Sequence, residues 1–250
     1  MTRPAFPARL PGRVASTAPS TRASVSPIDL TPASGLGLDS DRVRARMVQL
    51  LSQQGLADAA VLAAMQRVER HRFVDSALAN RAYEDTALPI GLGQTISKPS
   101  VVARMLSLLR GAAIPLTRVL EVGTGCGYQA ALLSLLAQEV YSIERLRDLH
   151  ERARTNLRAL QLANLHLLLG DGMLGYASGA PYAGILAAAC GPEVPQSWID
   201  QLAPGGRLVA PLEATRTGVQ TLLVLDQTEH GPRVQRLEAV HFVPLKSGIA

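Results

Sequence analysis

Three glycines lie where a short apolar segment meets a helix-like run, and together they could hold a cofactor. The segment Arg118–Gly123 (RVLEVG) leads into TGCGYQ, which places the other two glycines at Gly125 and Gly127. Glycine adopts positive φ without strain and lets a ligand approach the backbone, while the following helix presents unpaired N–H groups. The sequence therefore predicts a cofactor-binding turn, and a turn that holds no ligand is the alternative.

The spacing of these glycines separates two classes of cofactor site. The dinucleotide fingerprint is G-x-G-x-x-G, whereas this turn has G-x-G-x-G, and Tyr128 stands where the third dinucleotide glycine would be. A nicotinamide-linked oxidoreductase is therefore the second-ranked reading. A Walker phosphate loop is excluded, because neither Gly-Lys-Ser nor Gly-Lys-Thr follows the turn.

Two acidic residues end the next two apolar segments. Glu144 ends VYSIE, and Asp171 followed by Gly172 ends LHLLLGD. The carboxyl ends of parallel strands share one edge of a sheet, where ligands bind, so Glu144 is expected to accept hydrogen bonds from ribose hydroxyls and Asp171 from an adenine amino group. The alternatives are an exposed strand-end carboxylate for Glu144 and a cap of the next helix or turn for Asp171.

The elements that must position these residues are short apolar segments that alternate with longer ones. The apolar segments are Arg118–Gly123, Val140–Glu144, Leu165–Asp171, Gly184–Ala189, Gly206–Leu212, Gln220–Thr228 and Val234–Leu245. Stretches long enough for helices separate the first four of these segments, which is typical of βαβ units around a buried parallel sheet. No long helix fits between the last two, which predicts an antiparallel hairpin that closes the sheet.

The residues before this sheet are expected to add helices and a loop. Apolar residues recur at helical spacing from Asp39 onward, which predicts two N-terminal helices, and another apolar helix is expected over about 100–109. Residues 81–99 are rich in Gly, Pro and Thr and read as an extended loop. The Arg-rich run Leu146–Arg158 keeps apolar residues at helical spacing beneath its charges, so it reads as the solvated face of a helix.

Composition excludes several classes of function. The 250 residues, 47% of them hydrophobic, suit one α/β domain. Four of the 25 basic residues fall in residues 1–28, which hold no acid, so 21 bases face 20 acids in the rest of the chain. A body this close to neutral lacks the basic stripe that phosphate binding needs, and we expect no nucleic-acid partner.

Cysteine, histidine and hydropathy patterns bear on metals and location. The two cysteines, Cys126 and Cys190, are too few for a disulfide framework or a zinc cage, and the five histidines lack metal-ligand spacing. No apolar run approaches a membrane span, and the N-terminus lacks the apolar core of a secretory signal. We therefore expect a soluble, cytoplasmic protein with no metal and no membrane contact.

Several motifs together resemble one family. EVGTGCGYQ, VYSIE, GDG, PEVP followed by DQLAPGGRLVAP, and VHFVPL are similar to the bacterial form of the protein L-isoaspartate O-methyltransferase family. The resemblance covers roughly residues 39–250, and its most specific part is YEDTALPIGLGQTISKP. It implies an α/β fold with a doubly wound, Rossmann-like methyltransferase sheet, a C-terminal antiparallel hairpin and added N-terminal helices.

The resemblance also implies a chemistry and a set of site residues. The cofactor would be S-adenosyl-L-methionine, and the partners would be isoaspartyl proteins and peptides, whose methyl esters cyclise to a succinimide that partly hydrolyses to normal aspartate. A monomer is expected. The implied cofactor residues are Glu121, Gly123, Thr124, Gly125, Gly127, Glu144, Asp171 and Gly172. The implied substrate loop contains Thr95, Ile96 and Ser97.

Ser97 is the residue that the resemblance identifies as catalytic, through a hydrogen bond that orients the substrate carboxylate. Such a carboxylate, with a pKa near about 4, is already ionised at neutral pH and needs no general base. Alignment and water exclusion would then supply most of the rate, roughly 7–11 kcal/mol. The alternative for Ser97 is an N-cap of the helix that begins near Pro99 and Ser100.

Two departures from the family pattern keep other functions open. Ala183 stands where the family usually has aspartate, and Ala188–Gly191 replaces a more polar, proline-bearing stretch. The alternatives are a methyltransferase of small molecules, an NAD-linked oxidoreductase, and a catalytically weakened homologue that retains cofactor binding. The glycine spacing disfavours NAD, and the TIS segment disfavours a small-molecule acceptor.

Residues 1–38 hold six prolines and no hydrophobic period, which predicts a disordered tail; an organellar transit peptide is the less favoured reading. Deleting residues 1–38 is expected to leave the melting temperature and methyl transfer unchanged, because the tail carries no motif. Thermal unfolding and an activity assay of the full and truncated chains measure both. A large loss of turnover would show that the tail contributes to the site or to assembly.

Overall fold

A computed structural model describes residues 41–214 and 218–250, so the predicted tail over residues 1–38 lies outside the described residues. The α-helices are α1 (Asp41–Gln53), α2 (Ala59–Arg67), α3 (Pro99–Arg110), α4 (Tyr128–Ser134), α5 (Arg147–Leu157) and α6 (Gln196–Asp200). The 3₁₀ helices are η1 (Arg70–Phe73), η2 (Ser76–Arg81), η3 (Arg158–Leu160), η4 (Gly172–Leu174) and η5 (Ala177–Gly179).

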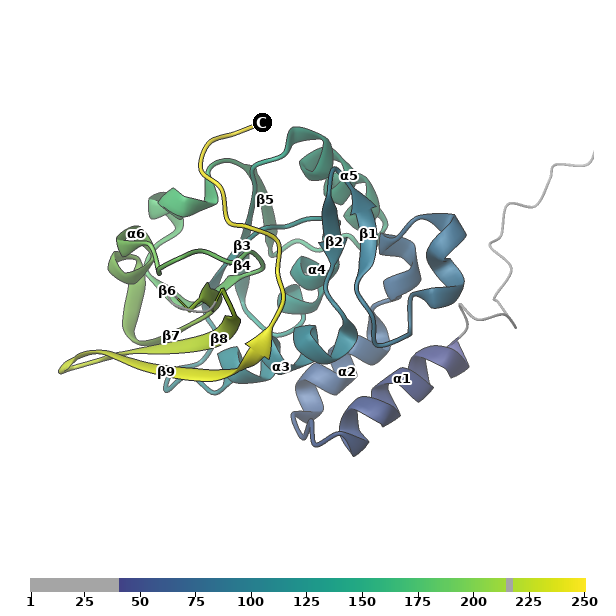
Figure 1. The fold of residues 1–250 in the computed structure, drawn as a ribbon, viewed down its shortest axis with the longest axis horizontal. Helices are drawn as coiled ribbons and strands as arrows, with labels where there is room; N and C mark the ends of the chain where they lie inside the picture. The colour runs from purple at the N-terminus through teal and green to yellow at the C-terminus, as the bar shows by residue number, and fades with distance from the viewer. Residues whose placement is uncertain (1–40, 215–217) are drawn as a thin grey trace, which may run out of the picture. The chain divides into compact units, whose positions relative to one another are not determined.

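Within the described residues, nine strands form two sheets, whose arrangement Figure 1 shows. The strands are β1 (Leu88–Gly91), β2 (Gln94–Ile96), β3 (Arg118–Val122), β4 (Glu139–Glu144), β5 (Leu165–Leu169), β6 (Tyr182–Ala187), β7 (Leu202–Glu213), β8 (Gln220–Thr228) and β9 (Gly231–Val240). The large sheet has the order β5-β4-β3-β6-β7-β8-β9, with β3 to β7 parallel and β8 and β9 antiparallel. The predicted doubly wound sheet with an antiparallel closing hairpin is confirmed.

The order of the strands determines where a ligand can bind. After β3, the next strands β4 and β5 are added on one side of β3, and the chain then crosses back to add β6 on the other side of β3. Loops that leave neighbouring strands in opposite directions open a crevice at their carboxyl ends. Successive residues of β3 point to opposite faces of the sheet. Val119 joins one apolar cluster, and Leu120 and Val122 join the other, so helices and loops pack against both faces.

The predicted extended loop over residues 81–99 is only partly right, because it contains the β1–β2 hairpin. Leu88 pairs with Ile96 and Pro89 with Thr95, and Leu88, Ile90 and Ile96 are all buried. The Gly-Leu-Gly turn masks the short apolar alternation that forms these strands, and all three residues of that turn have positive φ. The hairpin therefore has an apolar underside facing the protein.

The last predicted strand is also shorter than expected. The sequence predicts it over Val234–Leu245, but β9 ends at Val240, and residues 241–250 leave the sheet. In Figure 1 this final segment, in yellow, runs from β9 across the central sheet. Its backbone then pairs elsewhere: Cys190 N–H donates to Val243 O at 2.8 Å, and Leu245 N–H donates to Cys190 O at 2.7 Å.

The glycine turn between β3 and α4 is packed closely against α5. Gly123, Gly125 and Gly127 all have positive φ. A Cβ at Gly127 would lie 2.8 Å from Leu157 Cδ1, and Asn156 Nδ2 donates to Cys126 O at 2.9 Å. Only glycine at position 127 lets α5 lie this close to the start of α4.

Gly127→Ala is expected to destabilise the protein more than Gly231→Ala. Both residues have positive φ (+93° and +103°), but a Cβ at Gly231 meets nothing within 4 Å, whereas one at Gly127 must displace Leu157. Overpacking of this kind costs about 1–3 kcal/mol beyond the backbone strain that both variants share. Thermal unfolding of the two variants measures the difference, and equal melting temperatures would contradict the close packing of α5 on the turn.

Candidate active site

A cavity of about 430 Å³ lies at the carboxyl ends of the central strands. Its walls are the β1–β2 hairpin, the glycine turn, the ends of β3 and β4, the residues after β5 and β6, and the segment after β9. This volume is within the range of roughly 300–1,000 Å³ that is typical of small-molecule sites. The crevice expected from the strand order is therefore present as a real cavity.

Most of the predicted site residues line this cavity. Those that do are Gly123, Thr124, Gly125, Glu144 and Gly172 from the predicted cofactor set, and Thr95, Ile96 and Ser97 from the predicted substrate loop. Glu121, Gly127 and Asp171 do not line it. Residues far apart in the sequence thus meet at one site, as the shared edge of the parallel strands requires.

Glu144 is a buried carboxylate that ties the end of β4 to the glycine turn. It is 5% exposed, so the alternative of an exposed strand-end carboxylate is wrong. One oxygen accepts a hydrogen bond from Gly125 N–H at 2.9 Å and the other from Leu146 N–H at 2.9 Å. Each carboxylate oxygen has a further lone pair. Glu144 lines the cavity and can therefore still accept hydrogen bonds from the hydroxyl groups of a ligand.

Asp171 caps the 3₁₀ helix η4, which is the alternative considered above to a contact with the cofactor. Its Oδ1 accepts from Met173 N–H at 2.9 Å at the start of η4, and its Oδ2 accepts from Gly248 N–H at 2.6 Å. Trp198 Nε1 donates to the carbonyl of Gly172 at 2.8 Å, which fixes the backbone beside the cavity. The contact of Asp171 with an adenine amino group stays a prediction.

Ser97 follows β2 and faces the cavity, and it does not cap α3. The N-cap residue of α3 is Lys98, and the backbone N–H of Ser100 in the first turn donates to the Asp85 carboxylate at 2.8 Å. The helix-cap alternative for Ser97 is therefore wrong, because Asp85 from the YED sequence performs that task. No hydrogen bond of the Ser97 hydroxyl is found within residues 41–214 and 218–250, which leaves this donor available to a ligand.

Glu121 lies beneath the cavity in a closed polar network. It is fully buried; its Oε2 shares a hydrogen bond of 2.5 Å with Ser142 Oγ, and Gln129 Nε2 donates to its Oε1 at 3.0 Å. The Ser142 hydroxyl also shares a hydrogen bond of 2.6 Å with Thr124 Oγ1. Burial is the main cause that raises the pKa of Glu121 to about 8; the hydrogen bonds with Ser142 and Gln129 lower this pKa, and the charge of Glu144 raises it.

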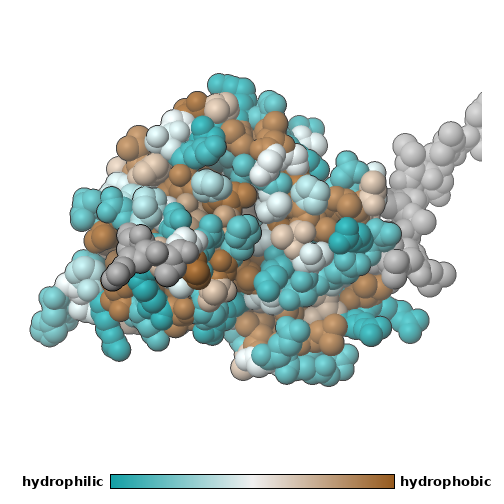
Figure 2. Space-filling view, in the orientation of Figure 1, coloured by the Kyte–Doolittle hydropathy of each residue, from teal (hydrophilic) through white to brown (hydrophobic). Residues whose placement is uncertain are grey.

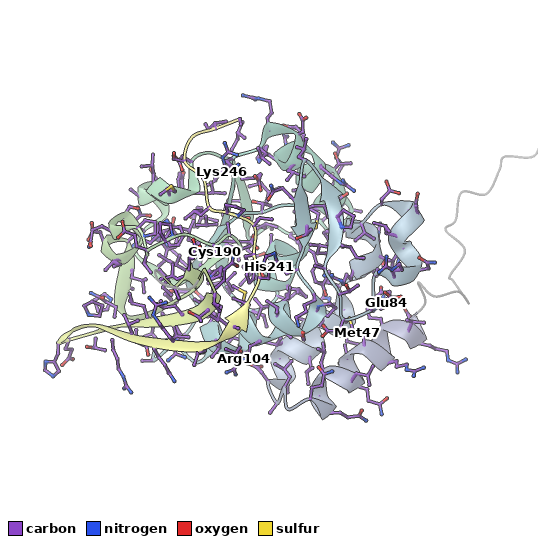
Figure 3. The ribbon with its side chains drawn as sticks, in the orientation of Figure 1. Met47, Glu84, Arg104, Cys190, His241 and Lys246 are labelled. Atoms are coloured by element: carbon purple, nitrogen blue, oxygen red, sulfur yellow. The ribbon has the colours of Figure 1, made fainter. Side chains whose placement is uncertain are left out.

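The segment after β9 forms one wall that the sequence motifs did not assign to the site. Val243, Pro244, Leu245 and Lys246 line the cavity. Figure 3 labels His241 near the start of this segment and Lys246 farther along it. Beyond them, Arg145 Nε donates to Gly248 O at 2.9 Å. The VHFVPL motif carried the only sequence signal for this wall.

The residues that depart from the family pattern act through their backbones. Ala188 and Ala189 line the cavity, and Ala188 N–H donates to Val122 O at 2.8 Å. The next residue, Cys190, holds the final segment through its N–H and C=O groups. Ala183 is buried inside β6. The wall is therefore held here by backbone groups, which do not depend on the identity of the side chains.

Helix α5 supports the site more than the sequence suggested. Leu149, Ala153 and Leu157 form the predicted buried face. Arg152, however, belongs to the face predicted to be solvated, and its Nη1 donates to Ile90 O in the hairpin at 2.6 Å. Long side chains can cross from a surface helix to a neighbouring loop, and the sequence pattern has no signal for that reach.

Metal-binding clusters and membrane-spanning helices are missing from the part of the chain that the structure describes. Within residues 41–214 and 218–250, no cluster of three His, Cys, Asp or Glu side chains is placed to bind a metal ion. No helix in the same ranges is both long and apolar enough to cross a bilayer. Cys126 and Cys190 are free, buried thiols.

Known proteins share both the sequence and the fold. The sequence profile of the protein-L-isoaspartate(D-aspartate) O-methyltransferase family matches residues 42–250. The protein-L-isoaspartate O-methyltransferase of Methylibium petroleiphilum is 61% identical over 87% of this chain and 82% of its own length. Those of Leptothrix cholodnii (60%; 86% and 77%) and Burkholderia lata (55%; 88% and 71%) are similar as well.

Two solved structures have the same fold. A protein-L-isoaspartate O-methyltransferase superposes with a TM-score of 0.74 at 26% identity, over 82% of this chain and 67% of its own. A Plasmodium falciparum structure, titled a putative protein-L-isoaspartate O-methyltransferase in complex with S-adenosyl-L-homocysteine, gives a TM-score of 0.69 at 24% identity, over 81% and 98%. By sequence profile and by relatives at 55–61% identity, this chain belongs to the protein-L-isoaspartate(D-aspartate) O-methyltransferase family.

Proposed function

We infer that this chain is an S-adenosylmethionine-dependent protein-L-isoaspartate O-methyltransferase, which methylates the carboxylate of isoaspartyl residues in damaged proteins. The observation that carries this conclusion is the 61% identity, over 87% of the chain, to a protein of that name. The recognition of the family from its motifs is thereby confirmed. Neither the NAD-linked nor the small-molecule alternative is supported by the relatives.

The cavity has the polar groups and the space that this cofactor needs. Glu144 offers acceptor lone pairs at one end, and the glycine turn brings backbone close to the cavity near Thr124. When bound, S-adenosylmethionine supplies a methyl group on a positively charged sulfur. We propose the cavity-lining residues Gly123, Thr124, Gly125, Glu144 and Gly172 as its direct contacts, with Gly127 and Asp171 supporting them from outside the cavity.

Ser97 is the proposed catalytic residue, because its hydroxyl faces the cavity from the hairpin and can donate to a substrate carboxylate oxygen. Ile90, Ile96 and Leu245 line the same cavity and add apolar surface that disfavours water beside a bound substrate. Exclusion of water favours a reaction in which a negative carboxylate and a positive methyl donor give two neutral products, because the charged reactants lose more hydration than the neutral products do. Thr95 and Ile96 hold the hairpin backbone that positions Ser97.

The decisive assay is methyl transfer from labelled S-adenosylmethionine to an isoaspartyl peptide, with the normal aspartyl peptide as control. We expect label only in the isoaspartyl peptide. Equal labelling of both peptides would contradict the substrate assignment, and binding of S-adenosylhomocysteine without transfer would identify a catalytically weakened homologue.

We further propose that the chain works as a cytoplasmic monomer in which residues 39–250 form the methyltransferase domain and residues 1–38 a separate tail. Two free thiols suit a reducing compartment. The exposed large apolar side chains are scattered, and Figure 2 shows hydrophobic and hydrophilic residues interspersed on this face. Scattered apolar residues of this kind are normal on monomers. Sedimentation of the purified protein tests the oligomeric state.

Glu144→Ala is expected to weaken S-adenosylhomocysteine binding by roughly ten- to a hundredfold, because hydrogen bonds to a charged group contribute about 1.5–3 kcal/mol. Isothermal titration calorimetry measures the dissociation constant. Glu139→Ala is the matched control, since Glu139 begins the same strand at the opposite edge and contacts His166 on the surface. Equal weakening by both substitutions would remove Glu144 from the cofactor site.

Ser97→Ala is expected to lower kcat/KM for the isoaspartyl peptide by roughly ten- to a hundredfold, through loss of one donor to a charged acceptor worth about 1.5–3 kcal/mol. Its melting temperature and cofactor affinity should stay unchanged. Ser100→Ala is the control, because Ser100 lines a separate groove and not this cavity. Asp85→Ala should instead lower the melting temperature by removing the cap of α3. Normal kinetics in Ser97→Ala would show that Ser97 is structural.

A further inference from the structure

We propose that Glu121 is a positioning residue that decides, through Ser142, whether the Thr124 hydroxyl donates a hydrogen bond into the cofactor cavity. This inference rests on the proposed function, because it concerns how the same cavity holds its cofactor. The family resemblance predicts that Glu121 binds the cofactor, but its carboxyl group lies behind the cavity wall. Its influence must therefore travel through the groups that touch it.

The connection is a chain of three oxygen groups. Glu121 Oε2 lies 2.5 Å from Ser142 Oγ, and Ser142 Oγ lies 2.6 Å from Thr124 Oγ1. All three residues are buried, and Thr124 lines the cavity. Each hydroxyl has a single proton, so each can donate only one hydrogen bond. The direction of one hydrogen bond in the chain therefore determines the direction of the next.

The ionisation of Glu121 sets that direction. An ionised Glu121 can only accept, so Ser142 must donate to it, Thr124 donates to Ser142, and Thr124 turns only lone pairs toward the cavity. A neutral Glu121 can donate to Ser142, which then donates to Thr124 and frees the Thr124 proton for a ligand. Gln129 Nε2 donates to Oε1 at 3.0 Å, so a proton on this carboxyl belongs on Oε2, facing Ser142.

The charges around Glu121 favour the neutral form. On the neighbouring strand, Glu144 is the acidic group that acts on it, and the contacts from β4 and α4 are otherwise the uncharged Ser142 and Gln129. Complete burial without a cation disfavours the carboxylate and agrees with a pKa of about 8. At neutral pH most of the protein then holds Glu121 protonated.

The neutral form aims two donors at the cavity. One is the released Thr124 hydroxyl. The other is the second N–H of Gln129, a residue that also lines the cavity and whose first N–H donates to Glu121. Two adjacent donors suit an acceptor oxygen, such as those of the carboxylate that S-adenosylhomocysteine carries. Ionisation of Glu121 withdraws one of them, so affinity should fall as the pH rises.

Calorimetric titration of S-adenosylhomocysteine between pH 7 and pH 9 tests the chain of hydrogen bonds. The quantity compared is the ratio of the dissociation constant at pH 9 to that at pH 7. We expect this ratio to be about tenfold larger in the unaltered protein than in Glu121→Gln or Thr124→Val, because the group that controls it titrates near pH 8. Glutamine donates to Ser142 at every pH, which locks the donating state. Titration of the ligand's own amine changes all three proteins equally.

Thr124→Val separates this proposal from a direct effect of charge. It keeps Glu121 and the hydrogen bond between Glu121 and Ser142, but it removes the Thr124 hydroxyl. If its affinity still falls with pH as in the unaltered protein, the charge of Glu121 acts directly and the proposal is overturned. The proposal is overturned as well if Glu121→Gln keeps the full pH dependence, or if affinity rises with pH.

Unfolding without any ligand provides an independent readout. A carboxyl group whose pKa is higher in the folded state than in the unfolded state binds its proton more tightly when the protein is folded. Its contribution to the free energy of unfolding is therefore lost as the pH rises from the unfolded-state pKa to the folded-state pKa. The stability of Glu121→Gln relative to the unaltered protein should therefore increase from pH 5 to pH 8 in denaturant titrations. A constant difference would show that Glu121 is not protonated and would overturn the proposal.

The two experiments also separate this proposal from the proposed function. Failure of the unaltered protein to bind S-adenosylhomocysteine at pH 7 would contradict the function, while the unfolding comparison would still decide whether Glu121 is protonated. Binding with the same pH dependence in all three proteins would leave the function standing and overturn the hydrogen-bond chain alone.

Discussion

The hydrogen bond from Gly125 N–H to the Glu144 carboxylate is the contact on which the site depends. It joins the turn after β3 to the end of β4, so two neighbouring strands share one rigid edge. A carboxylate held by two backbone N–H groups cannot rotate freely, and the turn that it holds needs positive φ at three glycines. The floor of the cavity is therefore set by backbone geometry before any ligand arrives.

The remaining walls are attached to this floor by a few long-range contacts. Arg152 holds the hairpin through Ile90 O, Asp85 caps the helix that follows the hairpin, and Cys190 holds the final segment. Each contact links residues far apart in the sequence, and most use backbone groups on at least one side. The wall around Ala188–Gly191 is one example, because its hydrogen bonds to Val122, Val243 and Leu245 use backbone groups on both sides.

The sequence was most informative where local chemistry and strand order agree. Glycine spacing, strand-end acids and the parallel pattern predicted the sheet and its ligand-binding edge, and the resemblance of several motifs predicted the family. The sheet and the family are confirmed. The hairpin inside residues 81–99 was missed, because a Gly-rich turn hides strands of only four and three residues. The support from Arg152 and the Glu121–Ser142–Thr124 network depends on side chains that meet only in three dimensions. The functional roles of individual site residues stay predictions.

One consequence concerns the protein's own susceptibility to ageing. Asp171 is followed by Gly172, and an aspartate before glycine is where the next backbone nitrogen most easily attacks the side-chain carboxyl group, since glycine has no Cβ to hinder it. Here both carboxylate oxygens of Asp171 are held, by Met173 N–H and Gly248 N–H, and Gly172 is buried. These two hydrogen bonds hold the carboxyl group in place, which restricts its approach to the Gly172 nitrogen. The fold thus restrains, at its own Asp-Gly bond, the same rearrangement that produces isoaspartate in other proteins.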